Sequence, residues 1–108
     1  MQSVVFTLEI EVSPERREEV LTTLRLMMGP TEVQLGCVRC RLYLSTVNPN
    51  ALTLVEEWKS EVELQNHIRS REFENILAVM DMSEGPPEIR IDKVSRRTGL
   101  DAIAALRG

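Results

Sequence analysis

Residues 37–63 read CVRCRLYLSTVNPNALTLVEEWKSEVE, and this stretch decides the fold. It contains two runs of alternating polarity, 37–44 and 51–58, and alternation with a period of two is typical of half-buried β-strands. Between them, residues 48–50 are Asn, Pro and Asn, which are frequent turn formers. We therefore expect the two runs to pair as an antiparallel hairpin.

Strand and helix signals also precede the hairpin. Alternating polarity over residues 4–12 predicts a strand with one fully apolar face. Ser13-Pro14 then has the composition of a helix start, with Ser13 as N-cap. Because Gly29-Pro30 interrupts the helical pattern, we expect this helix to end near Met28, with an irregular or helical extension to Leu35.

A helix signal and then a strand signal follow the hairpin. Ser60 and Glu63 have the spacing of a capping box, which predicts a helix from Glu61 with a restart capped by Ser70. Alternation over 88–94 predicts a fourth strand. The order β-α-β-β-α-β predicts an α+β, ferredoxin-like fold with a four-stranded antiparallel sheet over residues 1–94. Residues 95–108 form an extension with an extra C-terminal helix.

Length and charge narrow the class of function. A chain of 108 residues has the size of one domain. Thirteen basic and seventeen acidic residues give a net charge of −4, which disfavours nucleic acid as a partner. No apolar run approaches the ~20 residues of a membrane span, and the first residues lack a leader pattern. We expect a cytoplasmic protein that binds no membrane.

Cys37 and Cys40 form a CxxC string without a second pair. In a regular strand, positions three apart point to opposite faces, so these sulfurs would not converge on one metal ion. We interpret them as packing thiols and expect no metal site.

Two helices can cover only one face of the predicted sheet. The uncovered face would carry Val5, Thr7, Cys37 and Tyr43, a mixture too apolar to face water alone. A second copy of the sheet is the expected cover, which predicts a homodimer. The short helix within 95–108 must dock on its own domain, dock on a partner subunit or fray, and we expect it to pack across the dimer.

Motifs in a fixed order resemble one family over about the first ninety residues. The chain resembles the antibiotic biosynthesis monooxygenase (ABM) family of dimeric α+β barrel proteins, including quinol monooxygenases. The matching segments are an opening strand running into Ser13-Pro14-Glu15-Arg16-Arg17-Glu18-Glu19, then Pro30-Thr31-Glu32, Gly36-Cys37-Val38-Arg39-Cys40, Asn48-Pro49-Asn50, Leu54-Val55-Glu56-Glu57-Trp58, Leu64-Gln65-Asn66-His67 and Ser70-Arg71-Glu72-Phe73.

The resemblance implies a sheet-to-sheet dimer with a pocket between each sheet and its helices. It implies a cofactor-independent monooxygenase that acts with O2 on a quinol or phenolic substrate, without flavin or metal. The sequence has no GxGxxG turn or P-loop, and its one histidine is too few for a 2-His-1-carboxylate iron site. The alternative is a non-catalytic small-ligand-binding or interaction module with the same barrel.

Oxygenation without a cofactor requires an electron-rich substrate, and deprotonating a phenol supplies one. His67 is the candidate base, because its unperturbed pKa is near neutrality. Trp58 is a candidate for stacking on an aromatic ring, and Tyr43 or Arg41 for donating to the oxyanion, with Thr7 as a further substrate contact.

Each of these residues also has a structural interpretation. His67 shares a helix side with apolar residues, where a histidine often hydrogen-bonds a backbone carbonyl. Trp58 would fill the corner between sheet and helix, and Tyr43 and Arg41 would only contact a partner subunit. Adjacent Glu56 and Glu57 point to opposite faces of a strand, so they cannot act as a carboxylate pair.

A haem-degrading branch of the same superfamily has a tryptophan, a haem-ligating histidine and an asparagine in its site. By motif position, His67, Leu77 and Thr7 or a neighbour stand at those places in this chain. Leucine has no atom that ligates iron, so we do not expect haem degradation.

Overall fold

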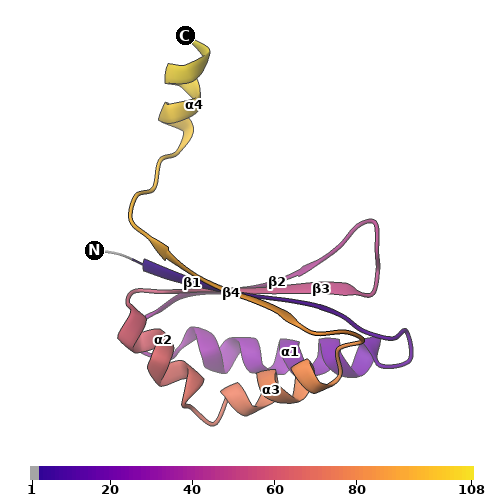
Figure 1. The fold of residues 1–108 in the computed structure, drawn as a ribbon. Coiled ribbons are helices and arrows are strands. Elements are labelled where there is room, and N and C mark those ends of the chain that lie inside the picture. Colours follow the sequence, from indigo (N-terminus) through magenta and orange to yellow (C-terminus); the bar gives the residue numbers. More distant parts are fainter. Residues whose placement is uncertain (1–2) are drawn as a thin grey trace.

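The computed structural model describes residues 3–108, in which a four-stranded sheet carries three helices on one face and a fourth helix stands apart (Figure 1). This arrangement confirms the predicted ferredoxin-like α+β fold. The elements in chain order are β1 (Ser3–Glu11), α1 (Arg17–Glu32), β2 (Cys37–Leu44), β3 (Ala51–Trp58), α2 (Glu61–Ile68), α3 (Phe73–Asp81), β4 (Glu88–Val94) and α4 (Leu100–Arg107).

The strands lie in the order β2-β3-β1-β4, and every neighbouring pair is antiparallel. The predicted hairpin joins β2 to β3, and its turn is closed by Asn48, whose side-chain oxygen accepts from the backbone N–H of Asn50 at 3.1 Å. Both central strands, β1 and β3, are therefore flanked on each side, which places the core beneath them.

Helix α1 differs from its prediction at both ends. It begins at Arg17 without a side-chain cap, because residues 13–16 form a turn in which the Arg16 N–H donates to the Ser13 carbonyl at 3.0 Å. It continues through Pro30 to Glu32, so the prediction of an end near Met28 was wrong and that of a helical extension was correct. Pro30 has no N–H, so the carbonyl of Leu26 loses its helical hydrogen bond. The side chain of Leu26 is 74% exposed, so this part of the helix faces solvent.

Strand β2 contains a register shift that the alternation did not reveal. Cys37 pairs with Trp58 and Arg39 with Glu57, so Val38 is an extra residue. The bulge places Cys37 on the helix-facing side together with Cys40. The expectation that Cys37 lies on the open face, opposite Cys40, was wrong for this reason.

The break between α2 and α3 is also built differently from the prediction. Ser60 caps α2 as expected, accepting from the Glu63 N–H at 3.4 Å. Ser70 does not cap α3, whose N-cap position is Glu72. The Ser70 hydroxyl instead donates to the carbonyl of His67 at 2.6 Å, which closes the last turn of α2.

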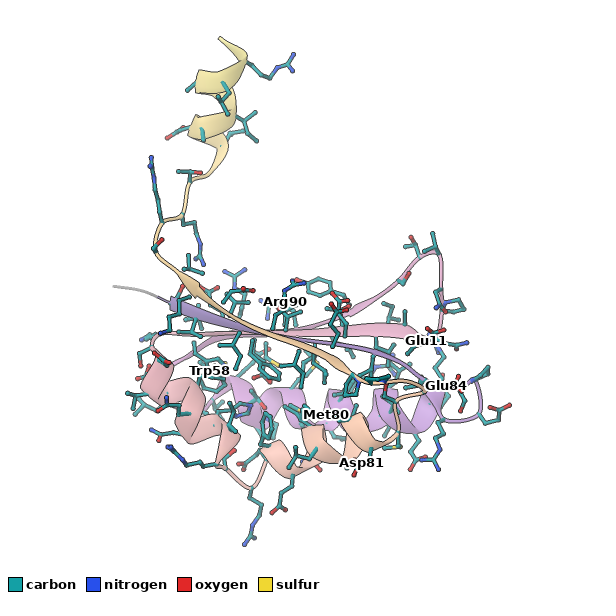
Figure 2. All side chains as sticks on the ribbon, in the orientation of Figure 1. Glu11, Trp58, Met80, Asp81, Glu84 and Arg90 are labelled. Atoms are coloured by element: carbon teal, nitrogen blue, oxygen red, sulfur yellow. The ribbon has the colours of Figure 1, made fainter. Side chains whose placement is uncertain are left out.

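The core fills the layer between the sheet and α1–α3, and Figure 2 shows Trp58 within this layer while Arg90 lies on the opposite face. No helix within residues 3–108 combines the length and the apolarity needed to cross a membrane. The buried hydrophobic residues are Val4, Phe6, Leu8, Ile10, Val12, Val20, Leu21, Leu24, Met27, Cys40, Leu52, Leu54, Trp58, Leu64, Phe73, Ile76 and Val79.

Candidate functional site

Four polar or aromatic side chains meet between the sheet and the C-terminal half of α2. They are Gln34, Glu56, Trp58 and His67, which we call the imidazole cluster. Alternation along β3 turns Glu56 and Trp58 toward the helices, and α2 carries His67 on its buried side. Gln34 comes from the turn between α1 and β2. The cluster is therefore assembled from three separate segments.

The ring of His67 is held between two aromatic side chains. It stacks on Trp58 with centroids 4.5 Å apart and an interplanar angle of 28°. The ring of Phe73 meets it edge-on at 5.5 Å and 88°. Only 1% of His67 is exposed. Because packing fixes the ring plane, the two ring nitrogens have defined partners.

Gln34 and Glu56 face the two nitrogens of His67. Nδ1 lies 2.8 Å from Gln34 Oε1, within hydrogen-bond distance. Nε2 lies 3.1 Å from Glu56 Oε1, within ion-pair distance, although the contact is not aligned as a hydrogen bond. Each ring nitrogen of His67 therefore has a polar side-chain atom within 3.1 Å.

Glu56 is fully buried and only partly satisfied. Its Oε1 accepts from the indole N–H of Trp58 at 3.3 Å. In the described part of the chain, four buried side-chain atoms have no hydrogen-bond partner: Thr31 Oγ1, Gln34 Nε2, Glu56 Oε2 and His67 Nε2. Such atoms are few in folded proteins, and three of these belong to the imidazole cluster. The cluster thus retains hydrogen-bonding capacity for a polar ligand.

Two thiols adjoin the cluster on β2. Cys40 is paired with Glu56, and Cys37 with Trp58. Burial, reinforced by the nearby Glu56 carboxylate, raises the pKa of Cys37 to about 11, and the pKa of Cys40 is raised for the same reasons. Both stay protonated at neutral pH and are poor nucleophiles. Among residues 3–108, no group of three His, Cys, Asp or Glu side chains is placed to hold a metal ion.

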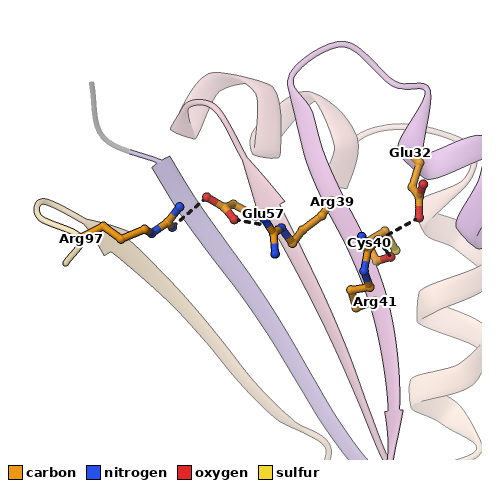
Figure 3. Close-up of polar contacts among 6 residues, drawn as sticks. All are labelled: Glu32, Arg39, Cys40, Arg41, Glu57 and Arg97. Carbon is orange, nitrogen blue, oxygen red and sulfur yellow. Dashed lines mark hydrogen bonds and ion pairs between the residues drawn. The ribbon is translucent and has the colours of Figure 1, made fainter. Parts of the chain in front are cut away.

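The other three candidate residues lie on the opposite face of the sheet, which we call the outer face. Thr7 and Arg41 are both register partners of Val55, and Tyr43 is the partner of Thr53. Tyr43 is 55% exposed, and Arg41 forms an ion pair with Glu32 at 3.4 Å (Figure 3). The structure thus brings His67 and Trp58 together and places the other three candidates apart from them.

Sequence reasoning missed Glu56 and Gln34 as members of the site. As expected, Glu56 and Glu57 point to opposite faces, since Glu57 binds Arg97 across the outer face at 2.8 Å. The available signal was alternation: Glu56 shares a face with Leu54 and Trp58, where a carboxylate is costly unless it has a partner. Gln34 carried no such signal, because it lies in an irregular turn.

A small cavity opens between α1 and α3. Its volume is about 200 Å³, and its lining includes Met27 of the core and Glu72. Glu72 directly precedes Phe73, the residue whose ring edge meets His67. An engineered apolar cavity of about 150 Å³ holds benzene, so this cavity has room for one aromatic ring.

One family model matches most of the chain. The model of the family described as "Antibiotic biosynthesis monooxygenase" matches residues 1–79. Curated relatives include "Putative monooxygenase YcnE" of Bacillus subtilis, 25% identical over 69% of this chain and 79% of its own. Another is "Uncharacterized protein sll1783" of Synechocystis, 24% identical over 85% of this chain. The chain spans only 63% of the length of that cyanobacterial relative.

A similar solved structure is a conserved protein from Methanosarcina mazei Go1. It is 30% identical, covers 85% of this chain and 92% of its own, and superposes with a TM-score of 0.80. The match supports the fold described above, in which a four-stranded sheet is covered on one face by helices.

Proposed function

Because the chain belongs to the antibiotic biosynthesis monooxygenase family, we propose that it is a cofactor-independent monooxygenase acting with O2 on a quinol or phenolic substrate. The observation that carries this proposal is the buried His67–Glu56 pair stacked on Trp58, with unpartnered polar atoms beside it. The B. subtilis relative named a monooxygenase supports the reaction class.

The proposed reaction balances without an outside reductant. A hydroquinone and O2 give a hydroxyquinone and water, so the substrate supplies all four electrons. A proton leaves the substrate hydroxyl, a ring carbon forms a bond to oxygen, and the O–O bond breaks as water departs. His67 accepts the first proton, Glu56 stabilises the resulting imidazolium, and Trp58 stacks on the ring.

Substrate access is the geometric requirement of this proposal. His67 is enclosed by Trp58 and Phe73, so side chains around the ring must move before a substrate can reach it. Motions of single side chains and short helices occur well within the time of a typical turnover.

We expect metal-free protein to consume O2 above the autoxidation rate with one or more members of a hydroquinone and naphthol panel, in an oxygen electrode. Glu56→Gln keeps the shape of the side chain but removes the charge that stabilises imidazolium, so it should slow uptake at least tenfold. Glu74→Gln, at an exposed position of α3, is the matched control and should retain the wild-type rate.

No uptake above autoxidation rejects the proposal for that panel. Equal rates of O2 uptake for wild type and Glu56→Gln would show that the imidazole cluster does not take part in the reaction. The second candidate function is a non-catalytic ligand-binding module, favoured by the complete burial of His67. Retention of a small molecule in native mass spectrometry, without O2 uptake, would select it.

We also propose that two copies of the chain associate through their outer faces. Thr7 is only 7% exposed, yet it shares this face with half-buried Val55 and exposed Tyr43. No helix between residues 3 and 94 covers it (Figure 1). In this arrangement Thr7, Arg41 and Tyr43 contact the partner or a ligand held between the two sheets.

Sedimentation at micromolar concentration should give twice the chain mass of 12.3 kDa. Val55→Glu puts a charge at the centre of the outer face and should produce the monomer. Val62→Glu, at a 62% exposed position of α2, should leave the dimer intact. A wild-type chain that sediments only at 12.3 kDa would contradict this association.

A further inference from the structure

The C-terminal arm, residues 95–108, carries apolar side chains that have no packing surface. Helix α4 has no buried residue, and Leu100, Ile103 and Leu106 are 78%, 57% and 88% exposed. Figure 1 shows it standing away from the rest of the molecule. The radius of gyration is 15.5 Å, against about 13 Å for a compact chain of this length. An isolated eight-residue helix is unstable in water, so α4 needs a surface to dock on.

The base of the arm is fixed to the outer face. Arg97 Nη2 lies 2.8 Å from Glu57 Oε2, and Arg39 approaches the same carboxylate at 3.5 Å (Figure 3). The hydrogen bond from Arg97 holds the pKa of Glu57 below its usual value. The arm consequently leaves the molecule on the side of the sheet opposite α1–α3, the side where the proposed partner would lie.

Charge separates the arm from the rest of the chain. The arm has three arginines and one aspartate, a net charge of +2. Residues 1–94 have ten basic and sixteen acidic side chains, a net charge of −6. The body of another copy is therefore electrostatically complementary to the arm.

The acidic charge is concentrated at the far end of the sheet. A cavity of about 350 Å³ there is lined by Glu9, Glu11, Glu84 and Glu88, and no basic residue lines it. The arm begins at the other end, where Val94 pairs with Ser3. When two outer faces pair with their strands antiparallel, the acidic end of each copy lies over the arm of the other.

The reach of the arm fits this arrangement. Packed sheets lie about 10 Å apart, and the five-residue linker 95–99 spans at most about 17 Å. The linker is therefore long enough for α4 to begin level with the partner's sheet.

We propose that the arm of each copy docks on a second copy of this chain, with Arg96 and Arg107 facing the acidic end of the partner and the apolar side of α4 buried there. This proposal rests on the outer-face dimer proposed above. Two-fold symmetry gives two such exchanges in each dimer.

Ile103→Asp tests the proposal because the Ile103 side chain is 57% exposed and is not part of the core of its own chain. It lies on the apolar side of α4, whereas Ala105 lies on the opposite side. Sedimentation should show Ile103→Asp weakening dimerisation at least tenfold and Ala105→Asp changing it less than twofold. Both positions are exposed within one chain, so neither substitution should impair folding.

Hydrogen exchange of the α4 amides supplies a second readout on the unaltered protein. Protection that appears only above the dimerisation concentration supports docking on the partner. Protection independent of concentration would mean docking on the same chain, and no protection at any concentration would mean fraying. Either result overturns the proposal, as does unchanged dimerisation of Ile103→Asp. Oxygen uptake is measured separately, so its failure leaves this result intact.

Discussion

Replacing His67 by leucine is expected to lower the free energy of unfolding by about 3–5 kcal/mol, the range for breaking a buried ion pair by removing one partner. The substitution keeps an apolar side chain between Trp58 and Phe73 but leaves Glu56 fully buried without its counter-group. Only the indole N–H would then contact that carboxylate. The cost comes from the abandoned carboxylate and not from a cavity.

The matched double variant distinguishes these causes. Glu56→Met combined with His67→Leu removes both members of the pair, and methionine adapts to irregular space. We expect most of the lost stability to return, because a packed apolar pair is often as stable as a buried ionic one. Asn66→Leu, at an exposed neighbouring position of α2, should change stability by less than about 0.5 kcal/mol.

Urea unfolding followed by fluorescence measures all of these variants, since Trp58 is the single tryptophan. The protomer concentration must stay fixed, because association adds to apparent stability. A double variant as unstable as His67→Leu alone would show that packing around the ring, and not the stranded carboxylate, is responsible.

The elements of the fold were predictable where local pattern and tertiary contact agree. Alternation located β1 and β3, and the Ser60 capping box located the start of α2. The bulge at Val38 was not predictable, because alternation on one strand does not report the register of its neighbour. The prediction of the end of α1 was wrong because the helix tolerates Pro30. The hydrogen bond that proline removes lies on the exposed side of the helix.

The site shows the same division between local and tertiary information. The sequence identified His67 and Trp58 as separate candidates but contained no sign that their rings stack. For Glu56, the sequence pattern indicated only that it points away from Glu57, its neighbour in the chain. The decisive neighbour of Glu56 is His67, eleven positions away, and the turn between β3 and α2 brings them to 3.1 Å. Gln34 completes the cluster from a segment with no periodicity at all.

Trp58→Ala is expected to cost about 3–5 kcal/mol of unfolding free energy, the range for deleting a large buried aromatic side chain. Trp58 is fully buried at the end of β3 and supports one side of the His67 ring. Its removal leaves a cavity beside the ring and takes from Glu56 the hydrogen bond that the indole N–H donates. Since most domains are stable by only about 5–15 kcal/mol, the variant should be close to unfolding at 37 °C.

Trp58→Phe separates the two contributions. Phenylalanine preserves an aromatic face against His67 but has no N–H for Glu56, so we expect a smaller loss of about 1–2 kcal/mol. Circular dichroism must follow the unfolding, because both variants lack the fluorescent residue. If Trp58→Phe were as unstable as Trp58→Ala, the indole-to-carboxylate hydrogen bond would outweigh the packing. Glu56 would then be the residue around which the cluster is organised, and His67 would be secondary to it.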